Sequence, residues 1–230
     1  MEIKVKVFGY KKEQLELIGR HIIASKNLEL YVNEKHLDAS LHIINNGEDD
    51  RTFNCVTADI LQEIRDNVYG EGDVTLGERA IEYLKFHKKQ LAVAESLTGG
   101  LIANSLIEVS GASEVLYEDL VTYSNESKIK RLGVSRYTID NYGAVSYECA
   151  YEMATGLLKN LDIDIALSTT GIAGPTGGSD IKPVGLTYIC IADRYESKVY
   201  NHCFEGSRNE IRMQAANTAL FYIINKIKNR

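Results

Sequence analysis

Short apolar runs alternate with amphipathic stretches over the last two-thirds of the chain, as expected where strands alternate with helices. Leu91–Ala94 is typical of a buried strand, and apolar residues then recur at helical spacing from Leu101 to Val109. Further strands are predicted at 120–123, 163–169, 186–192 and 198–204, and helices at 76–87, 147–161 and from 207 to about 228. The pattern predicts an α/β domain, a mixed sheet of about five strands with helices on both faces.

The first seventy residues show a different order of elements. Strands are predicted at 3–7, 28–32 and 39–44, and amphipathic helices at 13–24 and 53–68. This order predicts a small α+β unit with a helix pair on one face of a sheet, which resembles a KH-like or ferredoxin-like domain. A KH domain binds RNA through a G-x-x-G loop on a basic surface, and neither feature occurs here.

A turn-rich segment separates the two regions. Tyr69–Asp73 contains two glycines and two acids, and Thr75 and Glu78 then have the spacing of a capping box. We therefore expect two domains, a small KH-like domain at 1–72 and a larger domain at 73–230.

Composition and charge narrow the functional classes. The 230 residues carry a net charge of −6 and no run of 18 apolar residues, which argues against nucleic-acid and membrane partners. The four cysteines are scattered without a C-x-x-C pair, and the five histidines lack metal-binding spacing. The start of the chain has no apolar signal core. We expect a cytoplasmic protein with reduced thiols and without a metal site.

The strand at 91–94 leads into a serine-containing turn and then a helix. Such a turn exposes side chains at the carboxyl end of a strand, where open α/β sheets bind ligands. Thr98 occupies the expected N-cap position, and Gly99 and Gly100 allow close backbone packing. The free amides at the helix start suit an anion or an oxyanion. The alternative is that Ser96 merely caps the helix.

A second candidate group follows the strand predicted at 120–123. Asn125 is placed to begin a helix that carries Lys128 on its first turn. If Lys128 is desolvated near Ser96, its pKa falls and it can act as a general base. A solvated lysine is the alternative. Tyr123 is interpreted either as a core aromatic or as a proton carrier in the same site.

A glycine-rich loop and two arginines suggest a place for an anion. Thr170–Gly178 contains four glycines and a proline, which leaves backbone amides open as in phosphate sites. Arg208 and Arg212 are four residues apart and share a face near the start of the last helix, where they can grip a phosphate. A plain long turn and ordinary surface arginines are the alternatives.

Together these segments resemble the signature of the CinA C-terminal family, the PncC-type nicotinamide-nucleotide amidohydrolases. The resemblance runs from about Leu76 to the end of the chain. It is carried by six blocks in the same order: Ala94–Gly100, Tyr123–Lys128, Gly143–Ser146, Thr170–Pro175, Lys182–Gly185 and Gly206–Arg208. Leu97 stands where the family usually has cysteine, which leaves Ser96 as the candidate nucleophile. The first domain resembles more weakly the middle domain of full-length CinA, and we expect its molybdopterin-binding-like N-terminal domain, with any pyrophosphatase activity, to be absent.

The resemblance implies hydrolysis of the carboxamide of nicotinamide mononucleotide to nicotinate mononucleotide and ammonia, without a cofactor. It also implies a homodimer. The expected catalytic residues are Ser96 as nucleophile and Lys128 and Tyr123 as the proton relay. The expected substrate-binding residues are Thr98, Gly99, Gly100, Asn125, Thr170, Gly171, Gly174, Arg208 and Arg212.

Two other functions remain open on the sequence. The same residues could bind a nucleotide without turning it over, as a regulatory or scaffold module. The chain could also be an amidase for a different pyridine or nucleoside amide, and the cost of removing the 5′-phosphate would separate that case.

Overall fold

The computed structural model describes residues 1–24 and 26–228. The chain divides into two compact units, Met1–Arg79 and Ala80–Arg230, and the helix Leu76–Phe86 crosses this boundary.

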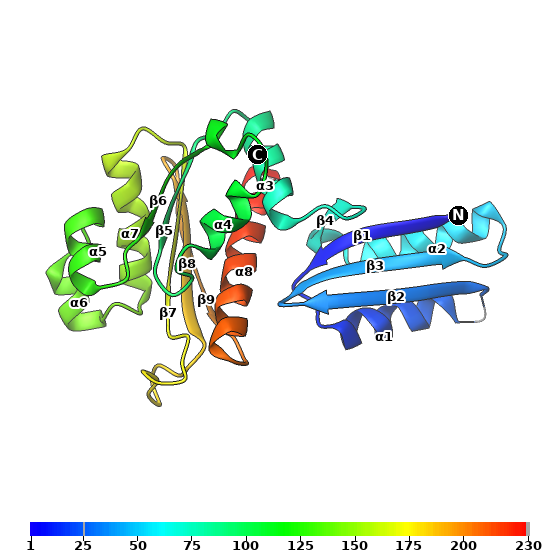
Figure 1. Cartoon of the computed structure of the whole chain (residues 1–230). Coiled ribbons are helices and arrows are strands. Elements are labelled where there is room, and N and C mark those ends of the chain that lie inside the picture. Colours follow the sequence, from blue (N-terminus) through cyan, green and yellow to red (C-terminus); the bar gives the residue numbers. More distant parts are fainter. Residues whose placement is uncertain (25, 229–230) are drawn as a thin grey trace. The chain divides into compact units, whose positions relative to one another are not determined.

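The first unit is a four-stranded antiparallel sheet with two helices (Figure 1). Its strand order is β2-β3-β1-β4, and with the chain order β-α-β-β-α-β this is the ferredoxin-like arrangement. Its core lies between the sheet and the helices and includes Val7, Leu41, Ile43 and Ile60. The elements are β1 (Glu2–Phe8), α1 (Lys12–Ile23), β2 (Leu28–Lys35), β3 (Asp38–Asn45), α2 (Asp50–Glu63), η1 (Arg65–Asn67) and β4 (Val68–Glu71).

The prediction of one helix over 53–68 is wrong at both ends. The helix begins at Asp50, where Asp49 accepts hydrogen bonds from the Arg51 and Thr52 amides, and it ends at Glu63. Val68 instead starts β4, which pairs with β1. Val68 lies four residues after Ile64 and so fits the helical stripe, whereas its pairing with β1 depends on residues far away in sequence.

The second unit contains the predicted mixed five-stranded sheet. The strand order is β6-β5-β7-β8-β9, in which β6, β5 and β7 are parallel and β8 and β9 are antiparallel. The elements are α3 (Leu76–Phe86), β5 (Leu91–Glu95), α4 (Leu101–Ile107), η2 (Ala112–Glu114), β6 (Leu116–Val121), α5 (Asn125–Leu132), α6 (Arg136–Tyr142), α7 (Tyr147–Asn160), β7 (Ile165–Gly171), β8 (Leu186–Asp193), β9 (Ser197–Cys203) and α8 (Arg208–Lys228).

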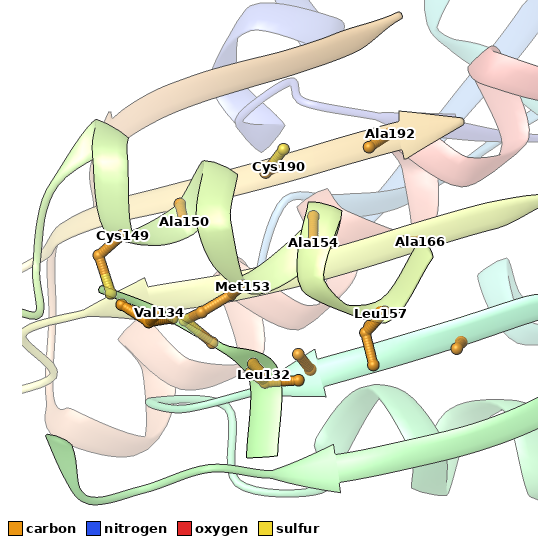
Figure 2. Close-up of a cluster of buried hydrophobic side chains, with 12 residues drawn as sticks. Leu132, Val134, Cys149, Ala150, Met153, Ala154, Leu157, Ala166, Cys190 and Ala192 are labelled. Atoms are coloured by element: carbon orange, nitrogen blue, oxygen red, sulfur yellow. The ribbon is translucent and has the colours of Figure 1, made fainter. Parts of the chain in front are cut away.

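Helices cover both faces of this sheet, with α7 on one face and α4 and α8 on the other (Figure 1). Small side chains on the strands let α7 pack closely against the sheet. Figure 2 shows Ala150, Met153 and Leu157 of α7 in the same buried cluster as these strand residues. The strand residues of this cluster are Ala92, Ala94, Ala166, Cys190 and Ala192. Burial of these apolar groups fixes the strands against the helix.

The strand predicted at 120–123 lies earlier in the chain. β6 begins at Leu116, which pairs with Leu91, and it ends at Val121, so Tyr123 lies beyond the strand. Because β5, β6 and β7 are parallel, their carboxyl ends meet at one edge of the sheet. The segments that follow β5 and β6 are those in which the sequence placed the candidate nucleophile and base.

Candidate functional site

A pocket lies at this edge of the sheet. Ser96 follows β5, Tyr123 follows β6, and Gly171 ends β7. The pocket is lined by Ser96, Leu97, Tyr123, Lys128, Ala144, Val145, Thr170, Gly171, Ala173 and Arg208. Six of the twelve predicted site residues are therefore among the lining residues: Ser96, Tyr123, Lys128, Thr170, Gly171 and Arg208.

Ser96 and Lys128 are in direct contact. The Lys128 ammonium nitrogen lies 2.9 Å from Ser96 Oγ. Lys128 is only 1% exposed, and Ser96 is 8% exposed. Ser124 caps α5 by accepting a hydrogen bond from the Ser127 amide, and this places Lys128 on the first turn of the helix. The two side chains form a buried Ser–Lys pair.

The surroundings of Lys128 favour its neutral form. Burial lowers the pKa of the Lys128 ammonium. Its nitrogen also contacts two backbone carbonyls, those of Thr122 at 2.7 Å and Tyr123 at 3.4 Å. A carbonyl only accepts, so in the neutral amine the two N–H bonds point to these oxygens and the lone pair is left for Ser96.

The turn after Ser96 is built differently from the prediction, and Thr98 is not the N-cap. Gly100 holds that position with a left-handed φ of 93°, and Gly99 has φ 60°. The Thr98 side chain is fully buried, and its hydroxyl lies 2.7 Å from that of Thr169. Thr98 therefore ties the turn to β7 and does not offer its side chain to a ligand.

The buried carboxylate of Glu95 caps α4 in place of Thr98. One oxygen accepts from the Gly100 amide at 2.8 Å, and the other accepts from the Ala103 amide at 2.9 Å. A negative charge at a helix start is stabilised by the helix dipole. The sequence carried a signal for this cap, because an acidic residue stands directly before Ser96 and two glycines follow. Sequence reasoning nevertheless gave Glu95 no role. The Gly100 amide is consequently occupied and unavailable to a ligand.

The other side of the pocket is formed where β7 passes into the glycine loop. Thr170 is 1% exposed and donates to the Ala144 carbonyl at 2.7 Å. A Cβ on Gly171 would lie 2.7 Å from the Leu186 carbonyl oxygen, so only glycine fits there. Gly174 has a left-handed φ of 73° and is not a lining residue of the pocket.

Arg208 connects two walls of the pocket. Its guanidinium donates to the Gly174 carbonyl at 2.8 Å and to the Tyr123 hydroxyl at 3.0 Å. Tyr123 is 63% exposed, so it is not a core aromatic. Arg208 therefore lies at the pocket with a positive charge, where an anionic group of a ligand can reach it.

Arg212 and Asn125 are placed elsewhere. Arg212 does not line the pocket, because its guanidinium donates to the carbonyls of Leu97 and Thr98, each at 2.9 Å. The structure thus removes Arg212 from the expected phosphate contacts. Asn125 is exposed at the start of α5 and does not line the pocket either.

Sequence reasoning also gave no role to the segment before α7. Ala144 and Val145 line the pocket, and Lys182 holds this segment by donating to the carbonyls of Tyr142 and Val145. The available signal was the pair of motifs Gly143–Ser146 and Lys182–Gly185, which the structure brings together.

Comparison with known proteins agrees with this architecture. The model of the CinA C-terminal domain family matches residues 73–227. The chain belongs to the CinA C-terminal domain family. A CinA superfamily protein from Klebsiella pneumoniae has a similar structure, with a TM-score of 0.65 and 31% identity over 67% of this chain and 97% of that one. The competence/damage inducible protein CihA from Agrobacterium tumefaciens gives a TM-score of 0.62 and 38% identity over 66% of this chain and 93% of that one.

Two curated relatives carry CinA-type names, and the first of them matches nearly the whole chain. A Clostridium perfringens protein named as a competence-damage inducible protein is 41% identical over 95% of this chain and 54% of its own length. A CinA-like protein of Kosmotoga olearia is 43% identical over 71% of this chain and 40% of its own length. The chain spans about half the length of the curated relatives it matches.

Among the described residues there is neither a metal-binding side-chain cluster nor a membrane-spanning helix. No group of three or more His, Cys, Asp or Glu side chains in this part of the chain is arranged to hold a metal ion. Within the same residues, no helix combines the length and the apolar character that a membrane span requires.

Proposed function

We propose that this chain is an amidohydrolase that converts nicotinamide mononucleotide to nicotinate mononucleotide and ammonia. The observation that carries the proposal is the contact of 2.9 Å between Ser96 Oγ and the buried Lys128 nitrogen. A serine next to a desolvated lysine is an activated nucleophile. The choice of substrate rests on the resemblance to the nicotinamide-nucleotide amidohydrolases.

The first half of the reaction forms an acyl-enzyme. Ser96 Oγ bonds to the carboxamide carbon while its proton passes to the neutral Lys128 amine. The carbonyl oxygen takes the negative charge. When the tetrahedral intermediate collapses, the C–N bond breaks and Lys128 returns the proton to the departing ammonia.

The second half restores the enzyme. A water molecule gives a proton to Lys128 and attacks the ester carbon. The bond to Ser96 Oγ then breaks, and the protonated Lys128 gives its proton back to the serine. The immediate products are a carboxylic acid and ammonia, which exchange a proton to give a carboxylate and an ammonium ion, so atoms and charge balance with water as the only co-reactant.

The side-chain contacts support a narrower proposal for the proton relay and for the phosphate site than the sequence did. Lys128 contacts Ser96 directly, whereas the Tyr123 hydroxyl is held by Arg208, so we place Lys128 as the direct base. We propose that Arg208, which donates to the Gly174 carbonyl of the glycine loop, binds the 5′-phosphate.

The deciding experiment measures ammonia release from nicotinamide mononucleotide by the wild-type chain and by Ser96→Ala. We expect release by the wild type and a loss of about 10³-fold or more in the variant, since the nucleophile is gone. Normal turnover by Ser96→Ala would overturn the proposal. If neither protein releases ammonia, nucleotide affinity becomes the next measurement, because tight binding without turnover identifies a binding module.

A substrate analogue that lacks the 5′-phosphate tests the substrate assignment separately. Removal of the 5′-phosphate, as in nicotinamide riboside, should lower kcat/KM strongly, because binding energy from remote groups is used in the transition state. Equal kcat/KM values for the two compounds would point to an amidase for a different pyridine or nucleoside amide.

A further inference from the structure

The turn between β5 and α4 is held from two sides. From the side of the sheet, Glu95 binds the amides of Gly100 and Ala103. From α8, Arg212 binds two successive carbonyls, with Nε on Leu97 and a terminal nitrogen on Thr98, both at 2.9 Å. The two Arg212 contacts join residues more than a hundred positions apart in the sequence.

The two carbonyl contacts also fix the directions of the N–H groups in the same two peptides. In a trans peptide the C=O of one residue and the N–H of the next point in opposite directions. The Leu97 carbonyl faces Arg212, so the Thr98 N–H points away from it. The Thr98 carbonyl also faces Arg212, so the Gly99 N–H points away as well. One guanidinium therefore turns two successive amides to the same side.

The Gly99 amide belongs to an exposed residue, whereas Thr98 is fully buried, so Gly99 supplies the donor that a ligand can reach. Among the described residues no acceptor is found for the Thr98 or Gly99 N–H, whereas the Gly100 amide is occupied by Glu95. Arg212 does not line the pocket, but Ser96 and Leu97 at the start of the turn do. The Gly99 donor is thus directed away from Arg212, three residues after the nucleophile.

We propose that Arg212 is a positioning residue that forms the oxyanion hole by fixing the peptides at 97–98 and 98–99, so that the exposed Gly99 N–H faces the ligand. This inference rests on the proposed function, because it deepens the same reaction. It accounts for an arginine that faces the reactive turn without reaching the pocket. Gly99 is part of the arrangement, since a Cβ there would lie 3.2 Å from the guanidinium and its φ is 60°.

The test compares Arg212→Met and Arg212→Lys with the wild type and with Arg136→Gln. Arg136 is an exposed arginine on α6 that pairs with Glu126 and serves as the matched control. Methionine keeps the aliphatic stem without donors, and lysine supplies a single point donor. We expect Arg212→Met to lower kcat by about 10²-fold or more, with KM changed less than about threefold, because oxyanion donors act mainly in the transition state. Arg212→Lys should recover part of the loss.

Two further readouts separate this role from a merely structural one. Affinity for the product, nicotinate mononucleotide, should stay within about threefold of wild type in both variants. Phenylmethanesulfonyl fluoride should modify Ser96 at least about tenfold more slowly in Arg212→Met, as followed by mass spectrometry, because its S–F bond also breaks through an anionic centre next to Ser96. A normal kcat, or equal losses in kcat and product affinity, would overturn the proposal.

The same experiments separate a failure of the Arg212 role from a failure of the substrate assignment. If the wild type releases no ammonia but phenylmethanesulfonyl fluoride still labels Ser96 faster than in Arg212→Met, the substrate assignment fails and the role of Arg212 stands. If Arg212→Met does not fold, Arg212→Lys and its labelling rate decide.

Discussion

The charge state of one buried side chain determines whether the site can react. Lys128 is surrounded by Ser96 and two backbone carbonyls, and within the described residues no carboxylate forms an ion pair with it. Desolvation is the largest effect on the ammonium and lowers its pKa, while the nearby Cys149 thiol acts more weakly in the opposite direction. A lowered pKa gives this lysine the lone pair that a general base needs over a wider pH range than an exposed lysine has.

Lys128→Arg should abolish base catalysis while keeping a cation in the same place. Arginine stays protonated, so we expect kcat to fall by about 10²–10⁴-fold. In the wild type, kcat/KM should fall as the pH drops through the lowered pKa of Lys128, since the protonated form is inactive. The pH profile of ammonia release checks both points, and an unchanged rate in Lys128→Arg would rule out Lys128 as the base.

Asp119 should make the folded state less stable as pH rises. Burial, followed by the charges of Glu95 and Glu118, raises the pKa of Asp119 to about 7. One of its carboxylate oxygens is buried without a partner among the described residues. The folded state therefore binds this proton more tightly than the unfolded state. Protonation of Asp119 contributes its full stabilisation of the folded state below about pH 4. This contribution to the free energy of unfolding, at most about 4 kcal/mol, is lost as the pH rises to 7 and above.

Urea unfolding at pH 4.5 and pH 8 measures this effect. The wild type should lose more unfolding free energy between the two pH values than Asp119→Asn, which cannot ionise. Asp140→Asn is the control, because Asp140 is exposed on α6. Equal pH dependence in wild type and Asp119→Asn would contradict the assignment.

At the level of elements, α7 fixes the helix that carries Lys128. A Cβ on Gly156 would lie 1.8 Å from the carbonyl oxygen of Leu132, the last residue of α5. Gly156→Ala must therefore push α5 away, at a cost of about 1–3 kcal/mol in unfolding free energy. Because small displacements of a reacting group are costly, we also expect kcat to fall, by up to about 10²-fold.

The matched control for Gly156→Ala lies on the same helix. Lys159 is exposed, and Lys159→Ala should change the unfolding free energy by less than about 0.5 kcal/mol and leave kcat unchanged. Urea unfolding and ammonia release measure both variants. A Gly156→Ala protein with normal stability would show that the two helices can separate without loss.

The sequence predicted local elements better than their partners. The buried strands β5, β7 and β8, the helix α7 and the capping boxes at Thr75 and Ser207 were found because periodicity and cap spacing are local signals. β4 was missed because its residues continue a helical stripe, and only its pairing with β1 makes them a strand. Arg212 was placed on the phosphate because nothing local shows that its guanidinium reaches carbonyls 114 and 115 residues away.

At the level of the whole molecule, each unit has a hydrophobic core of its own, and the candidate site is formed by the second unit alone. This division allows the contribution of the first unit to be tested by weakening its core. Leu41 is 1% exposed on β3, and Leu41→Ala should cost the first unit about 2–5 kcal/mol through lost burial and a cavity. Because the pocket residues all lie beyond Arg79, kcat at 25 °C should stay within about twofold of wild type.

Leu106→Ala is the matched change in the second unit. Leu106 is fully buried on α4, the helix that begins at the Ser96 turn, so its loss should lower both stability and kcat. Calorimetric unfolding of the two variants, alongside ammonia release, separates the effects. A large fall in kcat for Leu41→Ala, with the second unit still folded, would show that the first unit supports catalysis. The first unit contributes no lining residue to the pocket, so a substitution in its core could lower kcat only indirectly.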